Sequence, residues 1–140
     1  MSWELPYSGA SEITSYEVKF LSDDGLTYFT ELSYCSGSST VIKNSRSCVI
    51  PSEVFTQAPF SLEWGQSIFA TVDATNIKGT SEVSAAGNGA IILRVPDSPI
   101  NLENVPSLTD FDSIGLNWAD GAENGGAPIL DYRVSYKNNL

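Results

Sequence analysis

The sequence contains no histidine, and this absence removes the commonest general base and metal ligand of proteins. Without histidine, neither a Ser-His-Asp triad nor a Cys-His site can be assembled. Basic residues are also few, with 7 lysines and arginines against 17 aspartates and glutamates, giving a formal net charge of −10. Such a surface repels phosphate backbones and anionic lipids, so we expect no nucleic-acid partner and no membrane-surface role. These shortages predict a protein that is not an enzyme.

Long apolar runs are missing too. No stretch of the sequence is long enough to span a bilayer, and Met1 is not followed by the basic region and apolar run of a signal peptide. A secreted protein would therefore carry its targeting segment outside these residues. The glycines of Gly87-Asn88-Gly89 precede a strand-like run and lack the lysine of a phosphate loop, which indicates a flexible turn.

Only two cysteines occur, Cys35 and Cys48, within one polar segment. An even count at short spacing in a turn-rich sequence favours a disulfide and an oxidising, extracellular or cell-surface location. The alternative is a pair of unrelated buried thiols.

Alternating apolar residues recur along the chain, whereas no helical stripe of useful length is present. Tyr16, Val18 and Phe20 alternate with Glu17 and Lys19, which is the pattern of a half-buried strand. A second alternating run carries polar residues between its apolar ones, and its apolar members are Ile68, Ala70, Val72 and Ala74. Frequent turn signals separate such runs, including Asp24-Gly25, Lys78-Gly79 and Gly125-Gly126. Short strands with many turns predict an all-β sandwich.

One design occurs twice in the sequence. Trp3 is followed by a turn-rich loop and then by Tyr16-Glu17-Val18, and Trp118 is followed by a similar loop and then by Tyr132-Arg133-Val134. The two tryptophans lie 115 positions apart and the two tyrosines 116, so the second loop is one residue longer. An insertion confined to a loop is typical of two copies of one domain.

The chain resembles fibronectin type III domains in these features. Those modules combine a proline-rich start, a strand ending in tryptophan, a Pro/Gly loop and a Tyr-x-Val strand, here Pro96-Asp97-Ser98-Pro99, Trp118, Gly126-Ala127-Pro128 and Tyr132-Arg133-Val134. The family's Ala-x-Asn-x-x-Gly-x-Ser segment is matched from Ala74 to Ser81. The resemblance implies an immunoglobulin-like β-sandwich whose core includes Trp3, Tyr16, Val18, Trp118, Tyr132 and Val134.

The resemblance also predicts the domain boundaries. Residues 1–96 form a domain that lacks its first strand, and residues 97–140 form strands A, B and C of a second, at Ile100–Val105, Ile114–Trp118 and Ile129–Tyr136. Two departures stand out. Ile68 occupies the place where the family usually has tyrosine, and an enlarged segment from Ser33 to Phe60 carries both cysteines. We interpret that segment as a loop pinned by the disulfide.

Trp64 is the aromatic residue that the family pattern does not explain. Leu62-Glu63-Trp64-Gly65 reads as a turn before the penultimate strand, so Trp64 is a candidate contact for a protein partner or a glycan. The alternative is a core plug beneath the disulfide loop.

No cofactor is expected, and calcium is the one metal to weigh. Asp23-Asp24-Gly25 and Asp110-Phe111-Asp112, together with Asp97, resemble partial ligand sets but lack the spacing of a recognised calcium loop. The isolated acidic residues Glu17, Glu63, Asp73 and Glu82 are expected on solvated faces or in turns.

The sequence thus predicts a non-catalytic structural module of a repetitive extracellular protein. Its partners would be neighbouring repeats or other copies, and the copies could assemble into a filament by strand or domain complementation. The alternatives are an adhesion or carbohydrate-binding module, which would use Trp64 and nearby loops on a glycan or surface protein, and a non-catalytic appendage of a secreted enzyme.

Overall fold

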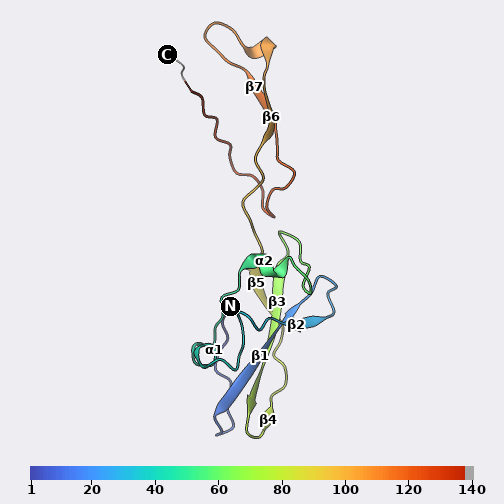
Figure 1. Ribbon diagram of the computed structural model, residues 1–140, viewed down its shortest axis with the longest axis vertical. Helices are drawn as coiled ribbons and strands as arrows, with labels where there is room; N and C mark the ends of the chain where they lie inside the picture. Colours follow the sequence, from blue (N-terminus) through green and yellow to red (C-terminus); the bar gives the residue numbers. More distant parts are fainter. Residues whose placement is uncertain (138–140) are drawn as a thin grey trace. The chain divides into compact units, whose positions relative to one another are not determined.

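The computed structural model describes residues 1–137 and divides the chain into two compact units. The first unit runs from Met1 to Ile92 and the second begins at Leu93 (Figure 1). Antiparallel strands dominate both units, which confirms the predicted β class. The elements are β1 (Ile13–Leu21), β2 (Tyr28–Thr30), α1 (Thr40–Ser45), α2 (Ser52–Phe55), β3 (Ser67–Asn76), β4 (Gly79–Thr80), β5 (Gly87–Ile91), β6 (Ile100–Asn104), the 3₁₀ turn η1 (Pro106–Leu108) and β7 (Leu116–Ala119).

The first unit is organised around the pair formed by β1 and β3. In Figure 1 these two long strands lie side by side, and the register places Val18 opposite Val72. The short strand β2 pairs with the other edge of β1, while β4 and β5 both pair with the other edge of β3. The strand order is therefore β2-β1-β3, followed by the returning chain that carries β4 and β5.

One face of this sheet is apolar. Tyr16, Val18 and Phe20 of β1 are buried, as are Ile68 and Ala70 of β3. Their alternation along each strand places them on the same side. The strand-like runs recognised in the sequence therefore correspond to β1 and β3.

The segment between β2 and β3 covers part of the apolar face. The sequence predicts a loop here, but the segment contains the short helices α1 and α2. The Phe20 ring packs at 5.1 Å from Phe55 and 6.1 Å from Phe60, measured between ring centroids. Neither helix could be recognised from a periodic apolar stripe, because six and four residues are too few to show one.

The layer that faces the sheet contains few residues in extended, paired conformation. Apart from α1, α2 and their connections, it holds one short backbone pairing, between Met1–Trp3 and Arg46–Cys48, centred on the bridge from Ser2 to Ser47. A complete second sheet is not present among the described residues.

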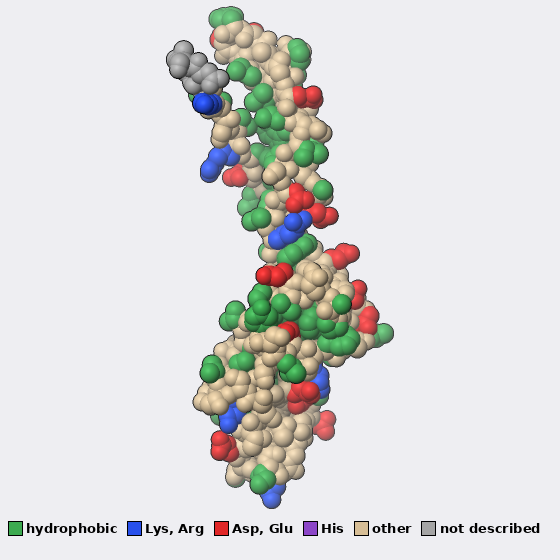
Figure 2. All heavy atoms as spheres, in the orientation of Figure 1, with side chains coloured by type: hydrophobic (Ala, Val, Ile, Leu, Met, Phe, Trp, Pro, Cys, Tyr) green, Lys and Arg blue, Asp and Glu red, His purple; other side chains and the backbone are tan. Residues whose placement is uncertain are grey.

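The second unit consists of the hairpin β6–β7 and the chain that follows it. Asn104 pairs with Leu116 and Ile100 with Ala119, with a bulge between them at Asn101, whose φ is 56°. The third strand predicted at Ile129–Tyr136 is not formed: these residues pair with no other strand among the described residues. A strand needs a neighbour to form a ladder. Many apolar side chains of this unit are exposed, as Figure 2 shows, including Ile100, Leu102, Leu108, Phe111 and Ile114.

Candidate functional site

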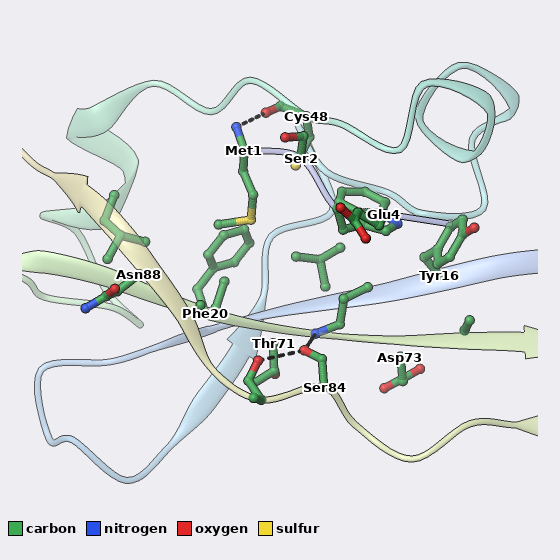
Figure 3. A pocket seen from close by; sticks show the side chains of 18 of the residues that line it. Met1, Ser2, Glu4, Tyr16, Phe20, Cys48, Thr71, Asp73, Ser84 and Asn88 are labelled. Atoms are coloured by element: carbon green, nitrogen blue, oxygen red, sulfur yellow. Dashed lines mark hydrogen bonds between the residues drawn. The ribbon is translucent and has the colours of Figure 1, made fainter. Parts of the chain in front are cut away.

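An apolar groove of about 770 Å³ lies on the sheet of the first unit (Figure 3). Its floor is formed by β1 and β3, with Val18, Ala70 and Val72 among the lining residues. One wall is the N-terminal segment from Met1 to Pro6, and the other is the exposed chain from Ser81 to Ala90. A groove of this size and composition is in the range of sites that bind ligands or extended peptides.

The N-terminal wall is a strand paired along one edge only. The Met1 ammonium donates to the Cys48 carbonyl at 2.9 Å, and the Cys48 N–H donates back to the Met1 carbonyl at 3.0 Å. The Trp3 N–H donates to the Arg46 carbonyl at 3.0 Å. Since backbone groups alternate in direction along a strand, the N–H and C=O of Ser2 face the opposite edge. Neither group bonds to another described residue, so this edge of the wall is open.

Trp3 holds the wall against the floor. Its ring meets Tyr16 edge to face, with 5.3 Å between ring centroids. The indole Nε1 is buried and finds no hydrogen-bond acceptor among the described residues. Aromatic pairs of this geometry stabilise by roughly 0.5–1.5 kcal/mol beyond their buried area.

The disulfide fixes the strand that supports this wall. Cys35 and Cys48 are bonded, with their Cα atoms 5.3 Å apart, and both side chains are buried in the core cluster. The predicted pairing is confirmed. Because Cys48 exchanges hydrogen bonds with Met1, the disulfide also restricts the N-terminal wall of the groove.

Serine side chains complete the opposite wall. The Val72 N–H donates to the Ser84 hydroxyl at 3.1 Å, and the Ala74 N–H donates to the Ser81 hydroxyl at 3.1 Å. The Ser84 N–H donates in turn to the Val72 carbonyl at 2.9 Å. The backbone N–H and C=O groups of Val72 and Ala74 on this edge of β3 therefore already have hydrogen-bond partners. Those of Ser2, on the N-terminal wall, have none among the described residues.

The charged side chains among the residues that line the groove are acidic, and the N-terminal ammonium of Met1 is the positive group beside them. Glu4 and Glu82 are among the lining residues, and no lysine or arginine is. Asp73 lines the groove as well, but its carboxylate lies with Lys19 on the opposite, polar face of the sheet. Asp73 departs from expectation, because it is buried rather than solvated. Its carboxylate lies 3.8 Å from the Lys19 ammonium, which also pairs with Glu17 at 2.5 Å. The hydrogen bond to Glu17 is the main reason that the pKa of Lys19 is raised. The Lys19 side chain therefore stays positively charged beside buried Asp73.

Trp64 is not among the residues that line this groove. It is half-buried and packs against the core cluster, in the turn just before β3. The Glu63 N–H donates to the side chain of Gln66 at 2.8 Å, and the Gly65 N–H donates to the Ile92 carbonyl at 2.8 Å. These bonds fix the turn that sequence analysis placed here.

The second unit contains the same aromatic pair as the first. The rings of Trp118 and Tyr132 lie 5.5 Å apart, close to the separation of Trp3 and Tyr16. The Tyr132 hydroxyl donates to Asp120, and this hydrogen bond raises the pKa of the phenol above 10.0. Tyr132 and Val134 are 40% and 49% exposed, whereas Tyr16 and Val18 are 6% and 3% exposed. The difference arises because β1 is flanked by β2 and β3 and residues 129–136 have no neighbouring strand.

The two aspartate loops considered for calcium are occupied by their own hydrogen bonds. Asp24 accepts from the N–H and hydroxyl of Thr27, the N–H of Leu26 and the hydroxyl of Ser22, and the bonds from Thr27 are the main reason for its strongly lowered pKa.

Asp110 forms a similar turn. It accepts from the Ser113 hydroxyl and from the N–H groups of Asp112 and Ser113, and its pKa is lowered, chiefly by the Ser113 hydroxyl. Asp97 is paired with Arg94 at 3.2 Å. No group of three or more metal-binding side chains occurs within residues 1–137. Both loops are therefore turns stabilised by their own aspartates.

Comparison with known proteins assigns no family to the chain: no family model matches it, and no curated protein matches its sequence. Within the described part of the chain, none of the helices has the length and apolar character needed to cross a membrane. The site is therefore interpreted from its own geometry.

Proposed function

We propose that this chain is a non-catalytic structural module of a repetitive extracellular or cell-surface protein, built from fibronectin type III-like sandwich units that associate through strand complementation. The observation that carries the proposal is that the same kind of Trp–Tyr ring pair occurs in both units. The Trp3–Tyr16 and Trp118–Tyr132 ring pairs have nearly the same separation, and a Tyr-x-Val sequence follows in each unit.

The strand order in the first unit supports the sandwich assignment. Immunoglobulin-like sandwiches have one sheet in the order C′-C-F-G, facing a second sheet that contains strands A, B and E. The order β2-β1-β3-β5 fits the first sheet, with β1 as strand C and β3 as strand F. The pairing of Met1–Trp3 with Arg46–Cys48 then corresponds to fragments of strands B and E.

The exposed apolar surfaces support association. The first unit offers a sheet with an open groove, and the second offers a hairpin whose apolar side chains are exposed. Contiguous apolar surface of this kind is typical of an interaction site. The intramolecular disulfide supports an extracellular location, because such bonds persist in oxidising compartments.

The test is the assembly state of the full chain, measured by sedimentation velocity over a wide concentration range and by negative-stain imaging. We expect concentration-dependent oligomers or fibres. Non-reducing denaturing gels should still show a single band near 15.1 kDa, since both cysteines are used within the chain. A compact monomer at every concentration would overturn the proposed assembly.

A further inference from the structure

We infer that Asn88 is a modification site, at which the folded chain itself converts the asparagine into aspartate or isoaspartate. The co-reactant is water, and the product places a new carboxylate on one wall of the groove. The inference is independent of the proposed structural function. It rests on the different surroundings of the two Asn-Gly sequences in the chain, Asn88-Gly89 and Asn124-Gly125.

The reaction is a ring closure between an asparagine side chain and the backbone nitrogen of the next residue. That nitrogen gives its proton to hydroxide and attacks Cγ of the asparagine. The bond from Cγ to Nδ2 breaks, and the amide nitrogen takes a proton from water and leaves as ammonia. Water then opens the five-membered succinimide at either carbonyl, which yields aspartate or isoaspartate.

Glycine in the second position favours this reaction, because it has no Cβ to obstruct the approach and few backbone restrictions. In a folded protein the rate also depends on whether the glycine nitrogen can reach Cγ and be reached by hydroxide. Two Asn-Gly sequences in one chain should therefore react at different rates if the fold holds one of them and leaves the other free.

The backbone around Asn88 is only loosely held. The sequence predicts a flexible turn at Gly87-Asn88-Gly89, whereas the structure places these residues at the start of β5, where all three are exposed. The ladder with β3 has a bulge here, because Asn88 and Gly89 together lie opposite one residue, Phe69. A bulge disrupts the ladder locally, so rotation of this peptide group sacrifices little regular pairing.

The side chain of Asn88 is free as well. Its amide forms no hydrogen bond with another residue of the described range 1–137. Gly89 has a φ of 125°, and a Cβ built on it would meet no atom within 4 Å. Water and hydroxide therefore have access to this peptide group, which lies where Asn88 lines the groove (Figure 3).

Asn124 is the contrasting case. Its side-chain carbonyl accepts a hydrogen bond from the Gly126 N–H at 2.9 Å, which closes a turn of the Asx type. Gly125 is buried, and its carbonyl accepts from the Arg94 N–H at 3.0 Å. A Cβ on Gly125 would lie 2.2 Å from the Arg94 carbonyl oxygen, so the two backbones are in close contact. Ring closure at Asn124 would have to disrupt these contacts.

The product changes the charge of the groove. Glu4 and Glu82 already line it, and the formal net charge of the chain is −10. A carboxylate at position 88 adds a negative charge to the wall formed by residues 81–90. Isoaspartate also lengthens the backbone of β5 by one carbon atom, at the bulge where this strand already has one residue more than β3.

The first experiment incubates the folded full chain in mildly alkaline buffer and follows both asparagines by mass spectrometry of tryptic peptides. Trypsin cuts after Lys78 and Arg94, so Asn88 is the one asparagine in its peptide. Fragment spectra locate Asn124 within the peptide that ends at Arg133. We expect Asn88 to convert at least about ten-fold faster than Asn124, the effect of poor positioning on an intramolecular attack. Equal rates, or a faster Asn124, would overturn the inference.

The unfolded chain provides the reference. In urea with the disulfide reduced, both Asn-Gly sequences lose their structural surroundings, and we expect them to convert at similar rates. The same large difference in the unfolded chain would mean that the neighbouring residues, and not the fold, set the rates. An Asn88 that persists in the folded chain while it converts in the unfolded chain would also disprove the site.

The second experiment uses the matched variants Asn88→Gln and Asn124→Gln. Glutamine keeps the amide but would have to close a six-membered ring, which forms far less readily. Anion-exchange chromatography of the incubated, folded chain should reveal a more acidic species in the parent and in Asn124→Gln, but not in Asn88→Gln. An acidic species that forms in Asn88→Gln at the rate of the parent would refute the assignment.

Discussion

Removal of the disulfide should destabilise the first unit by about 3 kcal/mol. The bond closes a loop with a sequence separation of 13, and the entropy of closing a loop of that size in the unfolded chain corresponds to about 3 kcal/mol at 25 °C. The double variant Cys35→Ala/Cys48→Ala removes the bond and keeps small apolar side chains at two buried positions. The lost stability should therefore come mainly from the cross-link.

Tryptophan fluorescence during urea unfolding provides the assay. In a Trp118→Phe background the remaining tryptophans, Trp3 and Trp64, both belong to the first unit. We expect the double variant to unfold at a lower urea concentration than the parent. A reducing agent should produce the same shift in the parent and no shift in the variant. A loss below about 1 kcal/mol, the contribution of one ordinary hydrogen bond, would refute the reasoning that the cross-link stabilises the first unit by restricting the unfolded chain.

Four further predictions follow from individual contacts. Phe20→Ala should cost the first unit about 3–5 kcal/mol in a urea titration, because Phe20 is fully buried between Phe55 and Phe60; a loss under about 1 kcal/mol would mean that this cluster is not the core. Gly37→Ala should lower the melting temperature, since a Cβ there would lie 2.1 Å from the Tyr16 carbonyl oxygen, whereas Ser38→Ala, at an exposed position, should not. The pKa of Asp24 is lowered in the folded chain, so its ionised form stabilises the turn above the ordinary value of 3.8 and this stabilisation is lost as pH falls through the folded pKa; Asp24→Asn should thus be less stable than the parent at neutral pH, with a gap that narrows in strong acid, and a gap independent of pH would contradict this. Ultraviolet titration should find the pKa of Tyr132 above 10.0, and Asp120→Asn should bring it back toward that value; an unchanged titration in this variant would exclude the hydrogen bond.

The strands were the most predictable part of the molecule. The alternation at Tyr16, Val18 and Phe20 is strong because β1 has one buried face and one polar face. The same reasoning located β3. The strands corresponding to β6 and β7 were predicted from the family resemblance, and their observed bounds differ from the predicted ones by a few residues. Local turn residues and alternating patterns carry this information in the sequence.

The groove itself could not be predicted. It depends on which segments lie over the sheet, and this is decided by contacts between residues far apart in the chain, such as those of Met1 with Cys48. Burial of Asp73 was missed for the same reason, because Lys19 approaches it from a neighbouring strand. The strand predicted at Ile129–Tyr136 is wrong, because an alternating sequence forms a ladder only where a partner strand lies beside it.

The covalent loop has a consequence for a chain under tension. If the ends were pulled apart, residues between Cys35 and Cys48 would be shielded from the load, because force would pass through the sulfur atoms instead. The 13-residue separation of the cysteines corresponds to roughly 45 Å of extended chain. Reduction would release that slack, so the local redox potential would set how far the first unit can stretch before it resists.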